Sequence, residues 1–283
     1  MVDQSMFAGF RVDLAGKVAV VLGASAEGGT GWAIAEALAA QGAKVVVGAR
    51  SLAPLQRLAE RIGGTAIACD AGNEAQVAAL AKAALDTYGH LNIAVNSAGL
   101  PVMTLIADTT QANLDDAVRV DFFGNVYFVK YMAQAIGSNG SIVLISSMST
   151  THPVFPHYAY ACGKSASDCL VRYAAIEYGP RGIRVNSILP GAIKSEMARE
   201  AFAIPGFEDA YLRNIPLGRV GYPADFANTV LWLAGPSYVT GLNLQVSGGN
   251  QLTRFPYPSE LPLGEETYGA GKPLADRQGD APK

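Results

Sequence analysis

The feature that most constrains the fold of this sequence is its alternation of short apolar runs with longer helical stretches. The runs are rich in valine, isoleucine and leucine and show no polar face, which is typical of strands covered on both sides. Strands and helices that alternate through short connections form a parallel sheet with right-handed crossovers. We therefore expect a doubly wound α/β fold, in which about seven parallel strands form the middle of three αβα layers. The expected strands are Lys17–Leu22, Lys44–Gly48, Thr65–Cys69, Leu91–Asn96, Ser141–Ser146, Arg184–Leu189 and Leu242–Val246. The expected helices are Trp32–Gln41, Leu52–Ile62, Asn73–Tyr88, Gln111–Ile136, His157–Tyr178 and Pro223–Ala234.

This alternation predicts one domain, which we place at residues 14–253. Residues 1–13 form an expected N-terminal arm, and residues 254–283 an expected tail that is disordered in part or lies over a neighbouring subunit. The stretch 192–219 interrupts the rhythm and is rich in bulky apolar residues, which are Met197, Phe202, Ile204, Phe207, Tyr211 and Leu212. Because such folds bind ligands beyond the carboxyl ends of their strands, we expect 192–219 to be a lid over an apolar substrate.

Composition argues against several classes of function. The net charge is −3 and no run of lysine and arginine occurs, so nucleic acid is not an expected partner. No apolar stretch is long enough to cross a bilayer, and the first residues carry Asp3 and Asp13, unlike a signal peptide. The three cysteines, Cys69, Cys162 and Cys169, are odd in number and dispersed, which argues against a disulfide framework. We therefore expect a cytoplasmic protein without a membrane span.

A glycine-rich loop follows the first expected strand. Gly23 permits a tight turn, and Gly29 and Gly31 let backbone amides and a helix N-terminus approach a pyrophosphate. Ser25 and Thr30 lie in the same loop, and we include them in the expected binding site. A strand, a glycine loop and a helix in this order predict a dinucleotide-binding site.

The end of the second expected strand indicates which dinucleotide binds. It reads Gly48-Ala49-Arg50, so no carboxylate is placed to accept hydrogen bonds from the ribose hydroxyls of NAD. Arg50 can instead pair with a 2′-phosphate. We therefore expect NADP(H), with NAD(H) as the less favoured cofactor.

Tyr160 and Lys164 lie four residues apart in the helix expected at His157–Tyr178. Residues at this spacing share one face of a helix. A nearby ammonium favours the tyrosinate and so lowers the pKa of the phenol towards the range of a general acid/base. Ser147, just after the fifth expected strand, can hold a substrate oxygen beside that phenol. The trio suits proton transfer to or from a carbinol oxygen.

Taken together, these residues resemble the motifs of the short-chain dehydrogenase/reductase family, which has a Rossmann-like fold. The resemblance covers about Leu14 to Leu252 and rests on Gly23/Gly29/Gly31, Asp70, Asn96-Ser97-Ala98-Gly99, Ser147, Tyr160-x3-Lys164 and Pro190-Gly191. It implies that Tyr160 is the catalytic acid/base and that Ser147 positions the substrate oxygen. It also implies that Lys164 lowers the pKa of Tyr160 and holds the nicotinamide ribose.

The same resemblance implies further cofactor-binding residues. Asp70 and Ala71 would flank the adenine, and Asn96, Ala98 and Gly99 would support the fourth strand beneath the cofactor. The residues implied to line the nicotinamide are Pro190, Gly191, Ile193 and Ser195.

Three features depart from the family pattern. The glycine loop is longer than usual and contains Glu27, whose charge would oppose a phosphate. Ser247 stands where the family often has a carboxylate. The family's helix asparagine, which anchors a water linked to the lysine, corresponds to Asp121, which accepts hydrogen bonds but cannot donate when ionised. We count Asp121 among the candidate catalytic residues.

We expect an NADP(H)-dependent oxidoreductase that interconverts a secondary alcohol and a ketone on an apolar, alicyclic or steroid-like substrate. Four apolar or aromatic residues are expected to add to its pocket, namely Met103, Met148, Phe155 and Tyr158. His152, His157 and Cys162 lack an evident ligand geometry, so we expect no metal.

Two alternatives stay open. One is a double-bond reductase of the enoyl or dienoyl type, although enoyl reductases of this family usually have a tyrosine where His157 stands. Asp121 is reminiscent of dienoyl-CoA reductases, which usually lack the active tyrosine that is kept here. The other alternative is a non-catalytic NADP-binding scaffold or sensor, which would not need the serine, tyrosine and lysine.

We also expect a homo-oligomer, either a tetramer or a dimer. The two long helices carry more apolar surface than one side of a sheet can bury. The residues concerned are Phe122, Phe123, Tyr127, Phe128, Tyr131, Leu170 and Tyr173.

Overall fold

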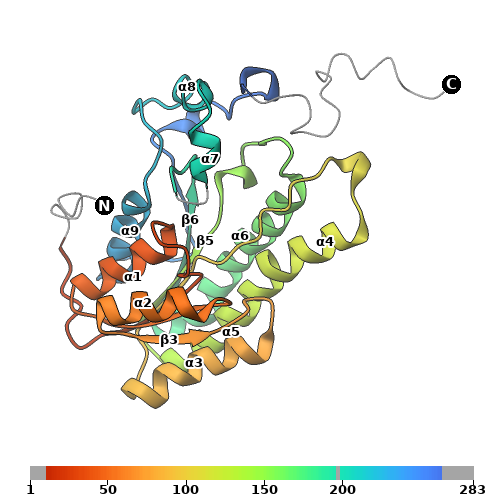
Figure 1. Ribbon diagram of the computed structural model, residues 1–283. Coiled ribbons are helices and arrows are strands. Elements are labelled where there is room, and N and C mark those ends of the chain that lie inside the picture. Colours follow the sequence, from red (N-terminus) through yellow and green to blue (C-terminus); the bar gives the residue numbers. More distant parts are fainter. Residues whose placement is uncertain (1–10, 196–197, 263–283) are drawn as a thin grey trace.

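The computed structural model describes residues 11–195 and 198–262. Within these residues, seven strands form one parallel sheet in the order β3-β2-β1-β4-β5-β6-β7 (Figure 1). The strands are β1 (Val18–Leu22), β2 (Lys44–Ala49), β3 (Thr65–Ala68), β4 (Ile93–Asn96), β5 (Gly140–Ile145), β6 (Ile183–Pro190) and β7 (Asn243–Val246). The doubly wound α/β fold predicted from the sequence is confirmed.

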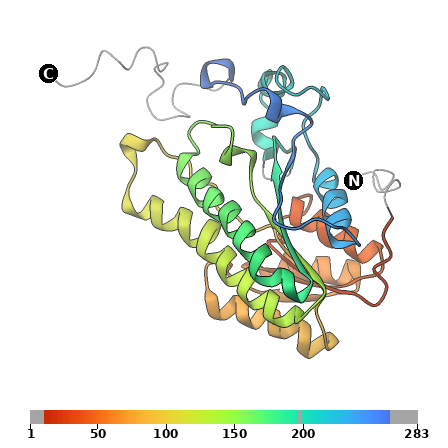
Figure 2. The same cartoon turned by 180° about the vertical axis from the view of Figure 1, so that it is seen from behind.

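Helices cover both faces of the sheet. One face carries α1 (Thr30–Ala40), α2 (Leu52–Ile62) and α9 (Pro223–Ala234). The other carries α3 (Glu74–Tyr88), α5 (Gly124–Ile136) and α6 (Tyr158–Tyr178), and Figure 2 shows this side. α4 (Gln111–Val118) packs against α6. α7 (Arg199–Phe202) and α8 (Phe207–Leu212) follow β6 and lie beyond the carboxyl ends of the strands (Figure 1).

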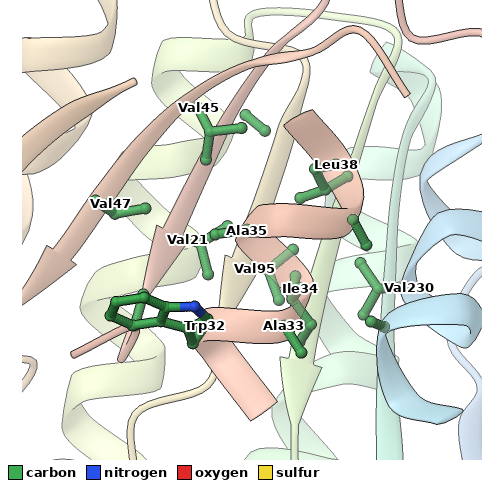
Figure 3. Packing of buried hydrophobic residues seen from close by; sticks show 14 of the residues in the cluster. Val21, Trp32, Ala33, Ile34, Ala35, Leu38, Val45, Val47, Val95 and Val230 are labelled. Carbon is green, nitrogen blue, oxygen red and sulfur yellow. The ribbon is translucent and has the colours of Figure 1, made fainter. Parts of the chain in front are cut away.

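Side chains of β1 alternate between two apolar cores, because successive residues of a strand face opposite sides of the sheet. Val20 belongs to the core under α3 and α5, and Val21 to the core under α1 and α9. The second core, shown in Figure 3, contains Val21 together with Ile34 of α1 and Val230 of α9, and all three are 0% exposed. Full burial of a side chain of this size contributes about 1.5–3 kcal/mol. Burial on both faces explains why the strands read as continuous apolar runs.

The topology creates a crevice beside β1. This strand pairs with β2 on one side and β4 on the other, so that Leu22 lies next to Gly48 and Asn96. The chain continues from β1 into α1 on one face of the sheet, whereas the segment after β4 leads to helices on the other face. Ligands of doubly wound folds bind at such a point. The glycine loop and the segment after Asn96 therefore meet at one place.

The helix expected at Gln111–Ile136 is interrupted. α4 ends at Val118, Arg119–Phe123 form a π-helical turn, and α5 begins at Gly124. Side chains satisfy the carbonyl of Asp121 within this turn, because it accepts hydrogen bonds from the Asn125 amide at 2.9 Å and from the Ser167 hydroxyl. Contacts with α6 thus support a π-turn that we did not predict.

The described part of the expected tail, residues 254–262, packs on the protein's own chain. Arg254 pairs with Glu260 at 2.6 Å, and Phe255 is only 7% exposed. Phe128, one of the apolar residues that we counted on the two long helices, is 0% exposed and belongs to the core. Met197 and most of the expected arm and tail lie outside the described residues. Within the described ranges, no helix has the length and apolar character that a membrane span needs.

Candidate active site

The glycine loop joins β1 to α1 at the crevice. Gly23 has a φ of +88°, a left-handed conformation that residues with a side chain rarely adopt. A Cβ atom on Gly31 would lie 2.3 Å from the carbonyl oxygen of Gly23, so the loop can close only around a glycine. α1 begins at Thr30, immediately after the loop. A tight turn followed by a helix N-terminus is the arrangement that binds a dinucleotide phosphate.

A cleft of ≈ 280 Å³ runs from this loop to α6. Many of the residues predicted to bind a cofactor line it, and they are Gly23, Gly29, Thr30, Gly31, Gly99, Tyr160, Lys164, Pro190, Gly191, Ile193 and Ser195. The glycine loop admits a phosphate at one end, and the residues after β6 meet Tyr160 at the other. These residues fit a nicotinamide dinucleotide.

Asn96 and Ala98 lie at the end of β4, and their neighbours Ser97 and Gly99 line the cleft. Asn96 is 1% exposed, and its amide donates to the side chain of Asn125 at 2.8 Å. Its oxygen accepts from the backbone N–H of Ala98 at 3.0 Å. These bonds fix the end of β4 against the helices below it.

Two predicted residues on the adenine side, Asp70 and Ala71, follow β3. The Asp70 carboxylate accepts from the backbone N–H of Gly72 at 2.9 Å and pairs with Arg119 at 3.1 Å. Ala71 is buried in the core below α5. The Asp70 side chain is therefore anchored to Arg119, the first residue of the π-turn.

The end of β2 presents one cation to solvent. Ala49 is 7% exposed, whereas the next residue, Arg50, is exposed. Within the described part of the chain, the Arg50 side chain makes no ion pair or hydrogen bond. Ser25 and the acidic Glu27 lie in the glycine loop beyond the cleft lining, with Glu27 exposed. Nothing in the described residues competes for the Arg50 guanidinium.

Ser147, Tyr160 and Lys164 converge where the cleft ends. Ser147 follows β5, and its Oγ accepts hydrogen bonds from the N–H of Ser149 at 3.1 Å and from the Ser149 hydroxyl at 2.9 Å. Tyr160 and Lys164 lie one turn apart on α6, with the lysine Nζ 5.7 Å from the centroid of the tyrosine ring. The structure thus brings together the three residues that the sequence singled out.

Lys164 is buried among oxygen atoms. Its Nζ lies 2.9 Å from the carbonyl oxygen of Ile145, 3.5 Å from that of Ala98 and 3.1 Å from a carboxylate oxygen of Asp121. Lys164 is 2% exposed and Asp121 is 0% exposed. The fourth candidate catalytic residue, Asp121, therefore contacts the lysine directly.

Burial and neighbouring charges act in opposite directions on this cluster. Burial raises the pKa of Tyr160, Lys164 lowers it, and Asp121 raises it further, so that the net shift is upward. The lowering that we expected from Lys164 is therefore outweighed. Burial also raises the pKa of Asp121 against the opposing effect of Lys164. Burial lowers the pKa of Lys164, but Asp121 and Tyr160 raise it more, and the ammonium stays charged.

A second buried carboxyl group lies one turn after Lys164, and sequence reasoning missed it. Asp168 is 6% exposed and accepts a hydrogen bond from the Ser187 hydroxyl at 3.1 Å. Burial raises the pKa of Asp168, while the hydroxyls of Ser146 and Thr150 oppose this shift. Its spacing of four residues from Lys164 was the signal available in the sequence. Asp168 ties α6 to β6 and to the loop that carries Ser147.

An apolar cavity of ≈ 330 Å³ adjoins the cleft. Cleft and cavity share four lining residues, which are Pro101, Ser147, Tyr160 and Ile193. The remaining cavity residues are mostly apolar, and they are Ser149, Val154, His157, Ala192, Ala198, Ala201, Phe202, Phe207, Tyr211 and Phe255. Ser147 and Tyr160 therefore stand at the boundary between the two spaces.

Aromatic rings from two distant segments form one wall of the cavity. The ring centroids of Phe207 and Tyr211 lie 5.3 Å apart, and those of Tyr211 and Phe255 lie 6.3 Å apart. Phe202 stands perpendicular to Phe207 at 5.4 Å. The wall combines the expected lid with a residue from the expected tail. Sequence reasoning missed Phe255, because the composition of its segment resembles a linker.

Four residues that we expected in the pocket lie elsewhere. Among the residues described, Met103, Met148, Phe155 and Tyr158 are not part of the cavity lining. Met148 is 0% exposed within the protein, and Met103 is 64% exposed on the outer surface. Tyr158 forms a hydrogen bond with Thr109. Their proximity to Tyr160 in the sequence did not translate into contact with the cavity.

His157 occupies the N-cap position of α6, without a capping hydrogen bond from its side chain, and lines the cavity beside Tyr160. The two ring centroids lie 6.4 Å apart in an edge-on arrangement. Burial lowers the pKa of His157, against an opposing hydrogen bond with the backbone of Phe155. The imidazole is therefore neutral at pH 7 and, like Ser149, adds a polar group to the mostly apolar cavity.

Comparison with known proteins gives consistent matches over most of the chain. A family described as enoyl-(acyl carrier protein) reductase matches residues 23–251. The protein is 36% identical to 3beta-hydroxysteroid dehydrogenase 1 of Eggerthella lenta over 264 residues, which cover 86% of this chain and 96% of that protein. It is 32% identical to D-threitol dehydrogenase of Mycolicibacterium smegmatis over 253 residues, which cover 85% of this chain and 94% of that protein. The solved structure of a short-chain type dehydrogenase/reductase from Mycobacterium ulcerans matches with a TM-score of 0.83 at 29% identity, and covers 88% of this chain and 94% of that one.

Proposed function

Because the chain belongs to the short-chain dehydrogenase/reductase family, we propose that it is an NADP(H)-dependent oxidoreductase that interconverts a secondary alcohol and a ketone. One observation carries the proposal. Ser147 and Tyr160 line both the cleft that fits a dinucleotide and the apolar cavity beside it. A carbonyl group placed at this boundary meets a proton donor and a hydrogen-bond donor at once.

Each residue of the site then has a defined task. The Ser147 hydroxyl donates a hydrogen bond to the substrate oxygen and fixes its position. Tyr160 gives its phenolic proton to that oxygen in reduction and takes it back in oxidation. Lys164 holds its charge next to the phenol and stabilises the tyrosinate that forms when the proton leaves. The bound nicotinamide would supply or accept the hydride.

The cofactor would be held by the residues that line the cleft. Gly23, Gly29 and Gly31 admit the pyrophosphate to the N-terminus of α1. Pro190 to Ser195 lie at the end of the cleft near Tyr160, as expected for the nicotinamide side. Arg50, exposed at the end of β2, is available for a 2′-phosphate, which favours NADP(H).

We further propose an apolar, alicyclic or steroid-like substrate. The cavity wall is made of aromatic rings and small apolar side chains, with His157 and Ser149 as polar members apart from the catalytic pair. Among the relatives, one is named for a hydroxysteroid and another for D-threitol, a small polyol. The aromatic lining of this cavity favours a substrate of the first kind.

A panel of ketones tests the proposal directly. Cyclic and steroid-like ketones are incubated with NADPH or NADH, and the loss of reduced cofactor is followed by absorbance. We expect turnover of apolar cyclic ketones with NADPH and loss of this turnover in the Tyr160→Phe variant. Tyr158→Phe is a matched control, because Tyr158 lies on the same helix but outside the cavity lining. Equal activity of both variants would remove Tyr160 from the mechanism.

A double-bond reductase is the second candidate, because the matching family model is described as an enoyl-(acyl carrier protein) reductase. His157 stands where enoyl reductases of this family usually have a tyrosine. Asp121, reminiscent of dienoyl-CoA reductases, accompanies an intact Tyr160 here. Enoyl and dienoyl thioesters in the same assay distinguish the candidates, since consumption of NADPH with these compounds and not with ketones would favour the second. A chain that binds NADPH but reduces neither class would be the non-catalytic scaffold.

A further inference from the structure

The Lys164 ammonium is surrounded by acceptors from the protein itself. An ammonium has three N–H donors, and three oxygens surround this one, from Ile145 at 2.9 Å, Ala98 at 3.5 Å and Asp121 at 3.1 Å. Two of them are neutral carbonyls, so Asp121 supplies the negative charge. Its other carboxylate oxygen accepts from the backbone N–H of Leu100 at 3.3 Å. Asp121 is thus held on one side by the backbone and on the other by the lysine.

The surrounding structure leaves little room for any other arrangement. The π-turn Arg119–Phe123 carries Asp121 into the buried space next to α6. A Cβ on Gly99 would lie 3.2 Å from both the Asp121 carboxylate and the Lys164 Nζ. A Cβ on Gly163 would lie 3.1 Å from the Cβ of Asp121. Two glycines and an unusual helical turn therefore accommodate this one contact.

Among residues 11–195 and 198–262, two further titratable groups face the pair, and both belong to α6. Tyr160 lies one turn before Lys164, and the buried Asp168 lies one turn after it. The other elements packed against the ammonium, β5 and the segment after β4, contribute neutral carbonyls. A lone buried ammonium would pull Tyr160 towards its ionised form. With Asp121 ionised, the pair is neutral and this pull is largely cancelled.

We propose that Asp121 is a positioning residue whose carboxylate fixes the Lys164 ammonium and neutralises the charge facing Tyr160, so that Tyr160 serves as a proton donor at neutral pH. The inference rests on the proposed function and deepens it, because it assigns carbonyl reduction as the direction that the site performs best at neutral pH. The equilibrium of the reaction itself is unchanged. The role differs from that of the family's asparagine, which the resemblance links to the lysine through a water molecule.

A spectroscopic titration tests this inference without any substrate. Tyrosinate absorbance is followed against pH for the parent and for Tyr160→Phe, and the difference isolates Tyr160 from the other tyrosines. The same pair of measurements is made in the Asp121→Asn background. The amide keeps the size of the side chain, and its single acceptor oxygen can keep the bond to Leu100, but the negative charge beside Lys164 is lost. We expect Tyr160 to titrate about one pH unit lower in the variant, the lower end of the effect of a nearby charge.

Two controls separate charge from packing. Glu74→Gln neutralises an exposed carboxylate on α3 and should leave the titration of Tyr160 unchanged. Asp168→Asn should produce a smaller shift than Asp121→Asn, because Asp168 makes no ion pair with Lys164 among the described residues. If Asp121→Asn does not fold, as judged by circular dichroism, Asp121→Ser provides a smaller neutral side chain. An unchanged or upward shift in the folded variant would overturn the inference.

Activity profiles then connect the inference with the reaction. Alcohol oxidation requires the tyrosinate as base, so its half-maximal rate should move to lower pH by the same amount in Asp121→Asn. A purely structural role of Asp121 would lower the rate at every pH and leave the midpoint in place, which counts against the inference. If no alcohol or ketone reacts with the parent, the proposed function fails, while the titration still decides the role of Asp121.

Discussion

Replacement of Arg50 by alanine isolates the contribution of one guanidinium to cofactor choice. Arg50 is exposed at the carboxyl end of β2, and within the described residues its side chain has no ion pair or hydrogen bond to lose. Exposed substitutions of this kind change the free energy of unfolding by less than about 0.5 kcal/mol. Ala49→Asp is a less clean test, because Ala49 is 7% exposed and packs in the core, where an added carboxylate would be desolvated.

The size of the effect follows from the exposure of Arg50. A hydrogen bond to a charged group contributes about 1.5–3 kcal/mol, which corresponds to about 10- to 100-fold in affinity. Solvent and salt weaken an exposed contact, so we expect the lower end of this range, about tenfold, at physiological ionic strength. At low salt the loss should be larger. NAD(H), which has no 2′-phosphate, should bind the variant and the parent equally well.

Fluorescence titration of both cofactors against both proteins measures these four affinities, with thermal unfolding as the control for stability. Arg57→Ala is a matched control, because it removes an exposed cation from α2, further along the chain from the end of β2. The expected result is a selective loss of NADP(H) affinity in Arg50→Ala. If the parent binds NAD(H) as tightly as NADP(H), or if the variant loses affinity for both cofactors equally, Arg50 does not bind the 2′-phosphate.

Three further outcomes are expected. Tyr160→Phe should lower turnover by about 10²–10⁴-fold with NADPH affinity nearly unchanged, and retention of a tenth of the parent's turnover would contradict its role as acid/base. Tyr173 and Ile176 are 71% and 79% exposed on α6, so we expect a homo-oligomer, a tetramer or a dimer, in which these side chains are covered. Replacement of both residues by serine should weaken its association, and sedimentation of the parent as a monomer of 29.5 kDa would refute the expectation. A hydrogen bond from Arg254 lowers the pKa of Glu260 from 4.5 to about 2, so their contact should stabilise residues 254–262 above pH 4.5 and be lost as the pH falls towards 2. Hydrogen exchange of that segment across this range measures the effect, and exchange that is independent of pH after correction for the intrinsic rate would show that the pair contributes nothing.

The fold was predictable because its strands are buried on both faces. A strand such as β1 then has no polar side, and its apolar run stands out from the amphipathic helices around it. The close approach of Gly31 to Gly23 was likewise predictable, because only glycine fits at position 31 and the sequence has a glycine at that position. The spacing of Tyr160 and Lys164 predicted a shared helix face, and the structure places them one turn apart.

Contacts between distant segments left no comparable trace. The pairing of Asp121 with Lys164 depends on a π-turn, which differs from an α-helix by one step in hydrogen bonding and has no distinctive composition. Phe255 lines the cavity because its ring packs against the ring of Tyr211. The sequence around Phe255, however, has the composition of a linker. For the same reason the pKa of Tyr160 was predicted in the wrong direction. The neighbouring lysine was visible in the sequence, but the burial of the phenol, which raises its pKa most, and the contact of Asp121 with Lys164 were not.

The π-turn at Arg119–Phe123 also sets the rotation of α5 relative to α4, which direct their side chains to different neighbours. An α-helix advances about 100° per residue, so one additional residue in a turn rotates everything beyond it by about a quarter of a circle. α4 thereby presents one side to α6, while α5 packs against α3 and the sheet. Deletion of one residue in this turn would restore an uninterrupted helix with nearly the same helical content. It would also rotate Asp121 relative to α5, so that Asp121 could not face the lysine while Phe128 and Met132 keep their places in the core. The additional residue of the π-turn therefore lets one helical segment serve the core and the site together.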